Sequence, residues 1–200
     1  RSNSSQKESR RHNASRDVCG SLAMPIRITG GELGGRLISS PLSSKTRPTA
    51  SMTREALFNI LFDVSDYTVL DLFAGSGIVG IEALSRGAKC VYAVEQAHRQ
   101  AHEIYKAYQS LGLEKSLQLL EKNALSLTQG NLLVEGGFDL IYADPPFTEE
   151  YPDLLPFLKW LSPQGTAVFE CPSRSIPKWA KNAKVKRYGE STLLFFKSSL

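Results

Sequence analysis

Short apolar segments alternate with segments of helical pattern through the middle of this chain, and the alternation restricts its fold more than any other feature. The lengths and apolar content of five segments are typical of buried strands, at 68–73, 90–95, 117–120, 138–144 and 165–171. Helical patterns separate them, at 78–86, 97–111, 124–127 and 151–161. Strands that alternate with helices form a mostly parallel sheet with helices on its faces. We therefore expect an α/β fold.

The two ends of the chain depart from this alternation. Residues 184–188 and 192–196 predict two strands joined by a turn, which would close the sheet with a C-terminal antiparallel hairpin. Near the other end, residues 26–28 and 36–38 flank a glycine-rich turn and predict a small N-terminal β-hairpin extension. A polar loop follows this hairpin, and Thr49 or Ser51 could cap a helix over the apolar residues that come next, 55–62.

Residues 1–24 differ from the rest in composition. They are rich in Ser, Arg and Asn and have almost no large apolar side chains. Such a segment cannot bury enough surface to offset its ordering entropy, so we expect a flexible basic tail. Residues 25–200 then form one domain, with 25–50 as its hairpin and adjoining loop. We expect a cytoplasmic protein, although a Ser- and Arg-rich tail is also typical of organelle transit segments and leaves a stroma or matrix open.

The net charge leaves the kind of partner open, whereas the cysteine pattern and the apolar content argue against disulfide-rich, metal-binding and membrane proteins. The formal net charge of +4 is compatible with a polyanionic partner, and equally with a solvated basic surface. Cys19, Cys90 and Cys171 are widely spaced and lack a C-x-x-C pair, which favours free thiols over a disulfide framework or a metal site. No apolar stretch reaches the ~18–20 residues of a membrane helix, so we expect no membrane association.

A glycine loop follows the first strand of the alternating region. It has the sequence Asp71-Leu72-Phe73-Ala74-Gly75-Ser76-Gly77. In an open parallel sheet ligands bind outside the carboxyl ends of the strands, and glycines there let the backbone approach a ligand closely. Asp71 could order the loop and help to hold a ligand ammonium. Glu95 ends the next strand, where a carboxylate can accept hydrogen bonds from both ribose hydroxyls.

Two cofactors fit this loop. The residues from Gly75 to Gly80 match the G-x-G-x-x-G pattern of dinucleotide sites, with Glu95 at the expected distance, so NAD stays open. The acidic Asp71 just before the loop favours S-adenosylmethionine instead. Asn123-Ala124 follows the third strand, where a polar side chain can reach an adenine edge; a plain helix N-cap is the equally good interpretation of Asn123.

The fourth strand leads directly into Asp144-Pro145-Pro146-Phe147. Consecutive prolines stiffen the chain and lack N–H donors, but their carbonyls still accept. An exocyclic base amine is a poor nucleophile, because its lone pair is delocalised into the ring. Two acceptors, the Asp144 carboxylate and the Pro145 carbonyl, would orient such an amine, and Phe147 would stack on a base turned out of its helix. Positioning and electrostatics could then carry methyl transfer without a strong base.

These motifs together resemble the bacterial family that methylates a guanine N2 in small-subunit (16S) ribosomal RNA, the RsmD-like enzymes. The resemblance extends over nearly everything from Ile26 onward. It is carried by residues 71–88, by Asp144 to Phe147, and by three flanking blocks: Arg27 to Gly31 with Gly35-Arg36, Arg47 to Thr49 with Arg54 to Asn59, and Tyr188 to Thr192.

The resemblance implies a Rossmann-like, seven-stranded class I methyltransferase that uses S-adenosylmethionine and acts on ribosomal RNA or the assembling 30S particle. We also expect the protein to be a monomer. The resemblance further implies that Asp71 and the loop from Phe73 to Gly77 contact S-adenosylmethionine, the methyl donor. Glu95 would bind its ribose, and Asn123 and Ala124 would contact its adenine. The residues implied to face RNA are Arg27, Arg36, Lys45, Arg47 and Arg54. One position departs from the family pattern: Ala50-Ser51-Met52-Thr53 lacks the usual Asp, which affects how this loop would grip its substrate. Adenine N6 methylation and NAD-dependent oxidation are the alternatives.

Overall fold

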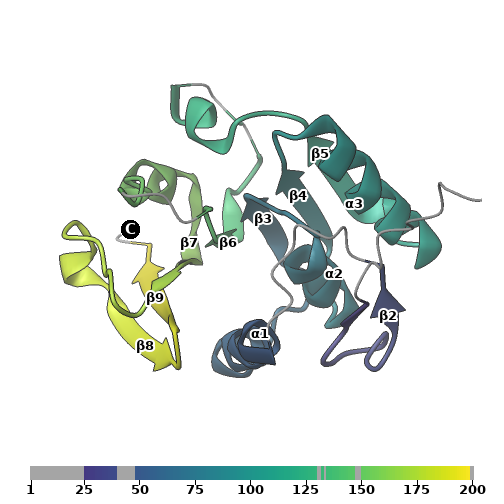
Figure 1. Cartoon of the computed structure of the whole chain (residues 1–200). Coiled ribbons are helices and arrows are strands. Elements are labelled where there is room, and N and C mark those ends of the chain that lie inside the picture. Colours follow the sequence, from purple (N-terminus) through teal and green to yellow (C-terminus); the bar gives the residue numbers. More distant parts are fainter. Residues whose placement is uncertain (1–24, 40–47, 130–131, 133, 147–149, 199–200) are drawn as a thin grey trace, which may run out of the picture.

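A seven-stranded sheet in the order β5-β4-β3-β6-β7-β9-β8 forms the centre of the molecule (Figure 1). The computed structural model describes residues 25–39, 48–129, 132, 134–146 and 150–198. The pairs from β5 to β7 are parallel, whereas β9 runs antiparallel to β7 and β8. The predicted α/β sheet with a C-terminal hairpin is therefore confirmed. Its strands are β3 (Thr68–Leu72), β4 (Cys90–Val94), β5 (Leu117–Leu120), β6 (Phe138–Ala143), β7 (Leu161–Pro172), β8 (Lys184–Tyr188) and β9 (Ser191–Lys197).

Helices of different kinds cover the two faces of the sheet. One face packs against three α-helices, and the other against short 3₁₀ turns. The α-helices are α1 (Pro48–Leu61), α2 (Ile78–Ser85) and α3 (His98–Ser110). The 3₁₀ turns of the second face are η2 (Ala124–Gln129), η3 (Leu155–Trp160) and η4 (Ala180–Asn182), while η1 (Glu114–Ser116) follows α3.

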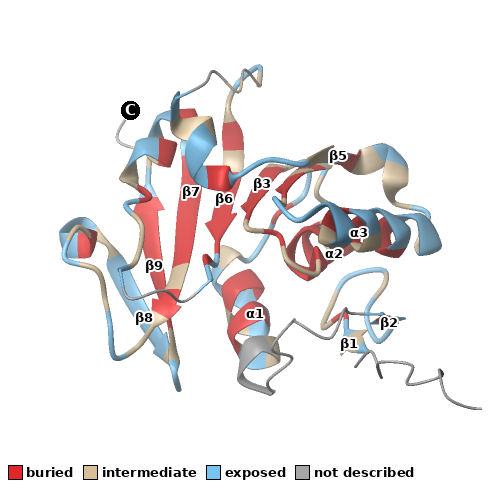
Figure 2. Cartoon of the chain, turned by 45° about the horizontal axis from the view of Figure 1, so that its top comes forward, coloured by how far each residue is buried: buried red, intermediate tan, exposed pale blue. Residues whose placement is uncertain are grey.

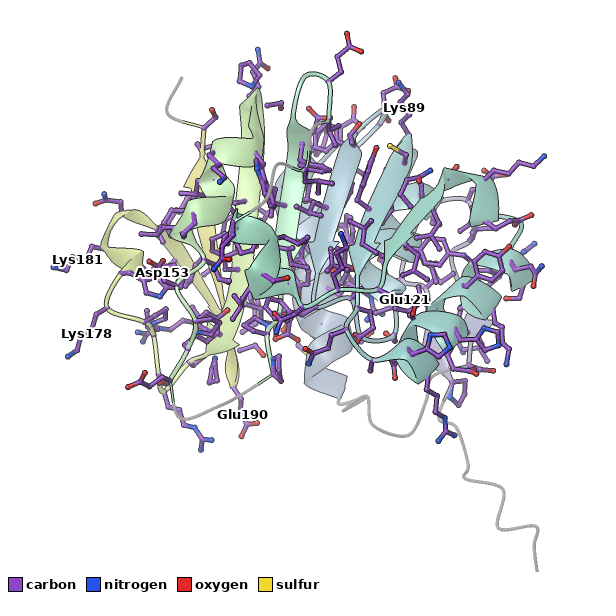
Figure 3. The ribbon with its side chains drawn as sticks, turned by 90° about the horizontal axis from the view of Figure 1, so that it is seen from above. Lys89, Glu121, Asp153, Lys178, Lys181 and Glu190 are labelled. Carbon is purple, nitrogen blue, oxygen red and sulfur yellow. The ribbon has the colours of Figure 1, made fainter. Side chains whose placement is uncertain are left out.

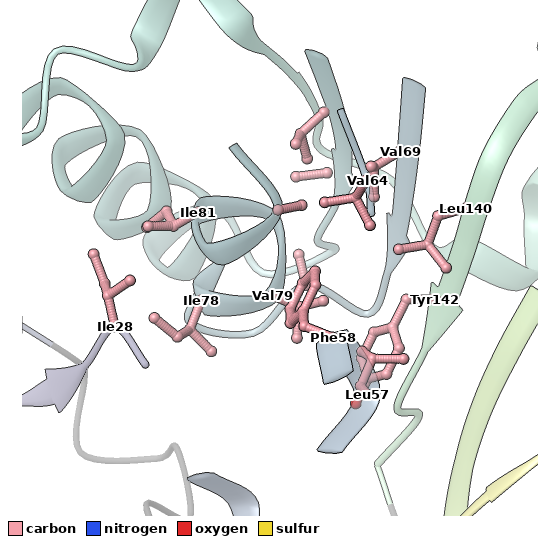
Figure 4. Packing of buried hydrophobic residues seen from close by; sticks show 14 of the residues in the cluster. Ile28, Leu57, Phe58, Val64, Val69, Ile78, Val79, Ile81, Leu140 and Tyr142 are labelled. Carbon is pink, nitrogen blue, oxygen red and sulfur yellow. The ribbon is translucent and has the colours of Figure 1, made fainter. Parts of the chain in front are cut away.

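The inner strands of the sheet supply both layers of the core because successive side chains point to opposite faces. In β3, Val69 belongs to the cluster on the α-helical face and Leu70 to the cluster on the 3₁₀ face, and both are fully buried. Figure 2 shows the inner strands almost entirely buried and β8 exposed at the edge. On the α-helical face Phe58, Val79 and Tyr142 belong to one buried cluster (Figure 4).

The N-terminal hairpin is present and lies against α2. It consists of β1 (Ile26–Arg27) and β2 (Leu37–Ile38), antiparallel, with Arg27 opposite Leu37. The Glu32 amide donates to the Ser85 carbonyl at 2.7 Å, and the Ser85 hydroxyl donates to the Gly30 carbonyl at 2.7 Å. Gly31 has φ +76°, and a Cβ there would overlap the Ser85 carbonyl. Only glycine allows the hairpin to lie this close to the helix.

Two predicted helices have different bounds in the structure. The predicted helix over 151–161 is only η3, because Pro152 and Pro156 remove backbone donors from that stretch. The helix predicted over 55–62 begins earlier, at Pro48, so Thr49 and Ser51 lie inside it rather than at a cap. Proline suits a first helical position, where its missing N–H costs no hydrogen bond.

The remaining predictions about organisation are tested only in part. Cys90 and Cys171 are free thiols, half-buried and buried respectively. No helix in the described part of the chain is long and apolar enough to cross a membrane. Residues 1–24, including Cys19, lie outside the described residues.

Candidate active site

The site lies where the strand order reverses, at the carboxyl ends of β3 and β6. These two strands are neighbours in the sheet although β4 and β5 come between them in the chain. Leu72 is in register with Ala143, so the glycine loop and Asp144 leave the sheet next to one another. A topological switch point of this kind is where open α/β sheets bind ligands. The two motifs found separately in the sequence are thus brought together.

Left-handed backbone conformations shape the glycine loop. Phe73, Gly75 and Gly77 have φ values of 60°, 57° and 72°, and Gly77 is the N-cap of α2. A Cβ on Gly77 would lie 3.0 Å from the Ile104 side chain and 3.1 Å from the Tyr108 ring. The turn and its close packing against α3 therefore both require glycine at 77. Ala74 is buried, whereas Phe73, Gly75 and Ser76 are half-buried.

Glu95 fixes the loop from the end of β4. One carboxylate oxygen accepts the Gly75 amide at 3.1 Å, and the other accepts the Ala97 amide at 2.9 Å. The Gln100 side-chain amide, from α3, donates to the Gly75 carbonyl. The backbone N–H and the carbonyl of Gly75 are therefore both hydrogen-bonded. Sequence reasoning missed Gln100, because it lies 25 residues from Gly75 in the chain and only the fold brings it to the loop.

Asp71 is a buried carboxylate beneath the loop. It is 2% exposed and accepts a hydrogen bond from the Gly80 amide in the first turn of α2. Its second oxygen, Oδ2, has no partner within the described residues. Burial first, and then the neighbouring Glu95 carboxylate, raise the pKa of Asp71 from 3.8 to about 7, against the opposing effect of the Gly80 hydrogen bond. A buried, incompletely paired acid at a ligand-binding edge is more typical of a binding site than of a stabilising contact.

The raised pKa predicts that Asp71 makes stability fall as pH rises. Because the folded chain holds this proton up to about pH 7 and the unfolded chain loses it near 3.8, stability is lost across that interval. Asp71→Asn cannot ionise and keeps an acceptor for Gly80. We expect the variant to be more stable than the parent at pH 8, by a few kcal/mol at most, and equal to it near pH 4. Urea unfolding at both pH values measures this; an Asn variant that is less stable at pH 8 would contradict it.

Asn123 and Ala124 begin the turn after β5. The Asn123 side-chain oxygen accepts the Leu125 amide at 2.9 Å, and the Asn123 side chain is exposed. This contact is the helix-cap interpretation of Asn123. It leaves the side-chain NH₂ group for another acceptor, so an adenine contact stays a prediction. Ala124 is buried against the 3₁₀ face of the sheet.

The Asp-Pro-Pro segment follows β6 directly. Asp144 and Pro146 are exposed and Pro145 is buried, whereas Phe147 lies outside the described residues. The exposed Asp144 carboxylate therefore stands at the switch point with solvent access.

The five basic residues predicted to face RNA fall into three groups. Arg27 and Arg36 are exposed on the N-terminal hairpin. Lys45 and Arg47 lie outside the described residues. Arg54 is 7% exposed, because its guanidinium donates to Glu82 at 2.7 Å and to the Arg27 carbonyl at 2.8 Å. The interpretation of Arg54 as an RNA-facing residue is therefore corrected: it joins the hairpin to α2.

Glu82 is the centre of that junction and was missed in the sequence. It is fully buried on α2 and binds Arg54 and, at 2.9 Å, Arg86. Thr29 of the hairpin also donates to it through both its amide and its hydroxyl. Arg86 in turn lies over the Phe58 ring at 4.9 Å. One carboxylate thus links the hairpin, α1 and the helix that begins at the glycine loop.

Comparison with known proteins decides the family. The family model described as conserved hypothetical protein 95 matches residues 26–197. The chain belongs to this family. Ribosomal RNA small subunit methyltransferase D of Escherichia coli (strain K12) is 35% identical over 152 residues, covering 72% of this chain and 74% of that protein. The protein of the same name from Haemophilus influenzae is 32% identical over 151 residues, covering 72% and 78%. The chain is an RsmD-like methyltransferase, and the predicted resemblance is confirmed.

Solved structures agree with the fold. The structure of yhhF from Escherichia coli superposes with a TM-score of 0.71 at 27% identity and covers 88% of this chain and 98% of its own. SMU.776, solved in complex with SAH, has a TM-score of 0.61 at 14% identity, covering 80% and 52%. Its likeness concerns the fold alone. Within the described residues no group of His, Cys, Asp or Glu is placed to hold a metal ion.

Proposed function

We propose that this methyltransferase transfers a methyl group from S-adenosylmethionine to the exocyclic N2 amine of one guanine in small-subunit ribosomal RNA. The observation that carries the proposal is the pairing of β3 with β6, which sets the glycine loop beside Asp144. The relatives named small subunit methyltransferase D support the RNA substrate. Such a substrate would place the reaction in the cytoplasm on assembling 30S particles, with the enzyme acting as a monomer.

The residues around the loop fit this cofactor. The unpartnered Oδ2 of Asp71 suits a methionine ammonium, which would lower the pKa that burial has raised. The left-handed backbone at Gly75 and Gly77 lets the donor approach the chain closely. Glu95 would accept from the ribose hydroxyls, and Asn123 and Ala124 would lie at the adenine.

The chemistry needs orientation more than acid–base strength. When bound, S-adenosylmethionine supplies an electrophilic methyl group on a sulfonium. Asp144 and the Pro145 carbonyl would accept the two amine hydrogens of the base and direct the nitrogen lone pair. Phe147 would stack on the base after it leaves its helix. Water then takes the proton that the methylated amine releases.

Two measurements test the proposal. Calorimetry with S-adenosylmethionine and with NAD should show binding of the first and none of the second. The enzyme should then transfer labelled methyl groups to small-subunit RNA or particles. NAD binding without methyl transfer would instead favour an oxidoreductase, and label on adenine N6 would favour the other amine.

A basic segment at the far edge of the sheet extends the candidate RNA surface. Between 174 and 187 the chain carries six cations and no acidic residue: Arg174, Lys178, Lys181, Lys184, Lys186 and Arg187. Lys178 and Lys181 project outward before β8 (Figure 3), and Lys184, Lys186 and Arg187 are exposed on β8 itself. β8 runs in the same direction as β7, so its Arg187 end lies on the side of the sheet where the parallel strands have their carboxyl ends, which is the side of the site.

Neutralising this edge should weaken RNA binding without affecting the donor. We expect Lys184→Gln with Lys186→Gln to lower affinity for small-subunit RNA at low salt and to reduce the slope of log K against log[salt] by about 2, because two phosphate contacts are lost. Filter binding across a salt series measures the slope, and Lys106→Gln on α3 is the matched control. If the lysines only protect an edge strand from pairing with another sheet, the double variant will bind RNA as the parent does.

A further inference from the structure

A second carboxylate stands beside Asp144 and has no part in the scheme above. Ala143, the last residue of β6, is in register with Phe169 of β7, so Asp144 and Glu170 are the residues that follow this pair in the two chain segments. Neighbouring strands lie about 4.8 Å apart, which puts both residues at the same edge of the sheet. Glu170 is half-buried, and it lies on the side of β6 away from the glycine loop on β3. A base whose amine reaches Asp144 from the donor side would extend toward Glu170.

Two tyrosines hold Glu170 in place. The Tyr142 hydroxyl donates to Glu170 Oε2 at 2.6 Å, and the Tyr151 hydroxyl donates to the Glu170 backbone carbonyl. Burial raises the pKa of Tyr142 well above 10, and the Glu170 and Asp144 carboxylates raise it further. The phenol therefore stays protonated and occupies one carboxylate oxygen. A carboxylate accepts several hydrogen bonds, so Glu170 keeps acceptor capacity for a donor on a ligand.

A fixed carboxylate of this kind distinguishes guanine from adenine. The Watson–Crick edge of guanine places an N1–H donor next to the N2 amine, and a carboxylate accepts from such donors. Adenine has a bare N1 acceptor next to its amine, so a carboxylate there would face a lone pair. A site built to accept an N–H rejects an analogue without it, because its buried acceptor is left unpaired.

We propose that Glu170 is a specificity-determining residue that accepts the N1–H of the target guanine, while Asp144 and the Pro145 carbonyl accept its amine hydrogens. The inference rests on the proposed function and names the group that selects the base. Accepting the N1–H also returns electron density to the ring, which makes the amine a better nucleophile. Tyr142 acts through Glu170 as a positioning residue.

The test uses 2-aminopurine, which keeps the amine but has no proton on N1. Small-subunit RNA carrying either guanine or 2-aminopurine at the mapped target is methylated by the parent and by Glu170→Gln. An amide can present either an oxygen or an NH₂ group, so the informative quantity is the ratio of kcat/KM for guanine to that for 2-aminopurine. We expect a ratio of about 100 or more for the parent and a ratio near 1 for Glu170→Gln. Tyr142→Phe, which frees Glu170 to move, should lower the ratio about tenfold.

Controls separate this proposal from folding and from the proposed function. Affinity for S-adenosylmethionine should stay within about twofold of the parent in each variant, and Glu103→Gln on α3 should leave the ratio unchanged. If Glu170→Gln loses the donor site as well, Tyr142→Phe decides the question. An unchanged ratio in the variants would overturn the role of Glu170 alone. A parent enzyme that methylates neither RNA would instead refute the proposed function.

Discussion

Asp144→Ala is expected to reduce kcat for methyl transfer by about a thousandfold or more while leaving donor affinity nearly unchanged. The loss is large because the carboxylate would orient a weak nucleophile in the transition state. Donor binding should survive because the glycine loop and Glu95 are held by contacts within themselves and with α3. Single-turnover transfer of labelled methyl groups, beside calorimetric titration of the donor, measures both quantities.

Asp144→Asn refines this expectation. The amide keeps one acceptor oxygen, so it should retain more activity than alanine and less than the parent. Asp153→Asn, at another exposed acid nearby in the chain, provides the matched control. Normal turnover in Asp144→Ala would remove the carboxylate from the mechanism, whatever the base methylated.

Glu82→Ala should have the largest effect on stability. It would leave Arg54 and Arg86 with side chains only 6% and 21% exposed and without their shared carboxylate. Removing one partner of a buried ion pair costs about 3–5 kcal/mol, because a buried charge is left uncompensated. We expect the free energy of unfolding, measured in urea, to fall by that amount.

A surface pair provides the comparison for Glu82. Glu103 binds Lys106 at 3.1 Å with side chains 37% and 55% exposed, and Glu103→Ala should cost less than about 1 kcal/mol. Combining Glu82→Ala with Arg54→Met should cost less than the two changes separately, because they share one contact. If Glu82→Ala is as stable as Glu103→Ala, the junction does not hold the hairpin to α2.

The sheet could be predicted because its strands are local patterns. Residues 117–120 form a strand with the predicted bounds, and both strands of the C-terminal hairpin lie where the pattern placed them. The helix expected over 151–161 failed because an apolar pattern was given more weight than two prolines. The longer extent of β7 could not be read either, since it depends on an irregular pairing with β6 near Phe138.

The residues of the site likewise divide into those that the sequence predicts and those that only the fold identifies. Asp71, Gly75 and Asp144 could be found because their motifs are contiguous in the chain. Glu82 and Glu170 could not, since each is defined by partners that come from distant segments. Arg54 shows the opposite error. A cation inside a motif was assigned to the RNA-facing surface, although it forms a buried ion pair with Glu82, 28 residues away in the chain.

One measurement tests the central claim most directly. Small-subunit RNA, as free RNA and as assembling particles, is incubated with the enzyme and S-adenosylmethionine, digested to nucleosides and examined by mass spectrometry. The account predicts one new N2-methylguanosine per RNA, mapped to a single position and absent without the enzyme or with Asp144→Ala. Methylation of adenine N6 alone, or no new methylated nucleoside with an enzyme that binds the donor, would contradict it.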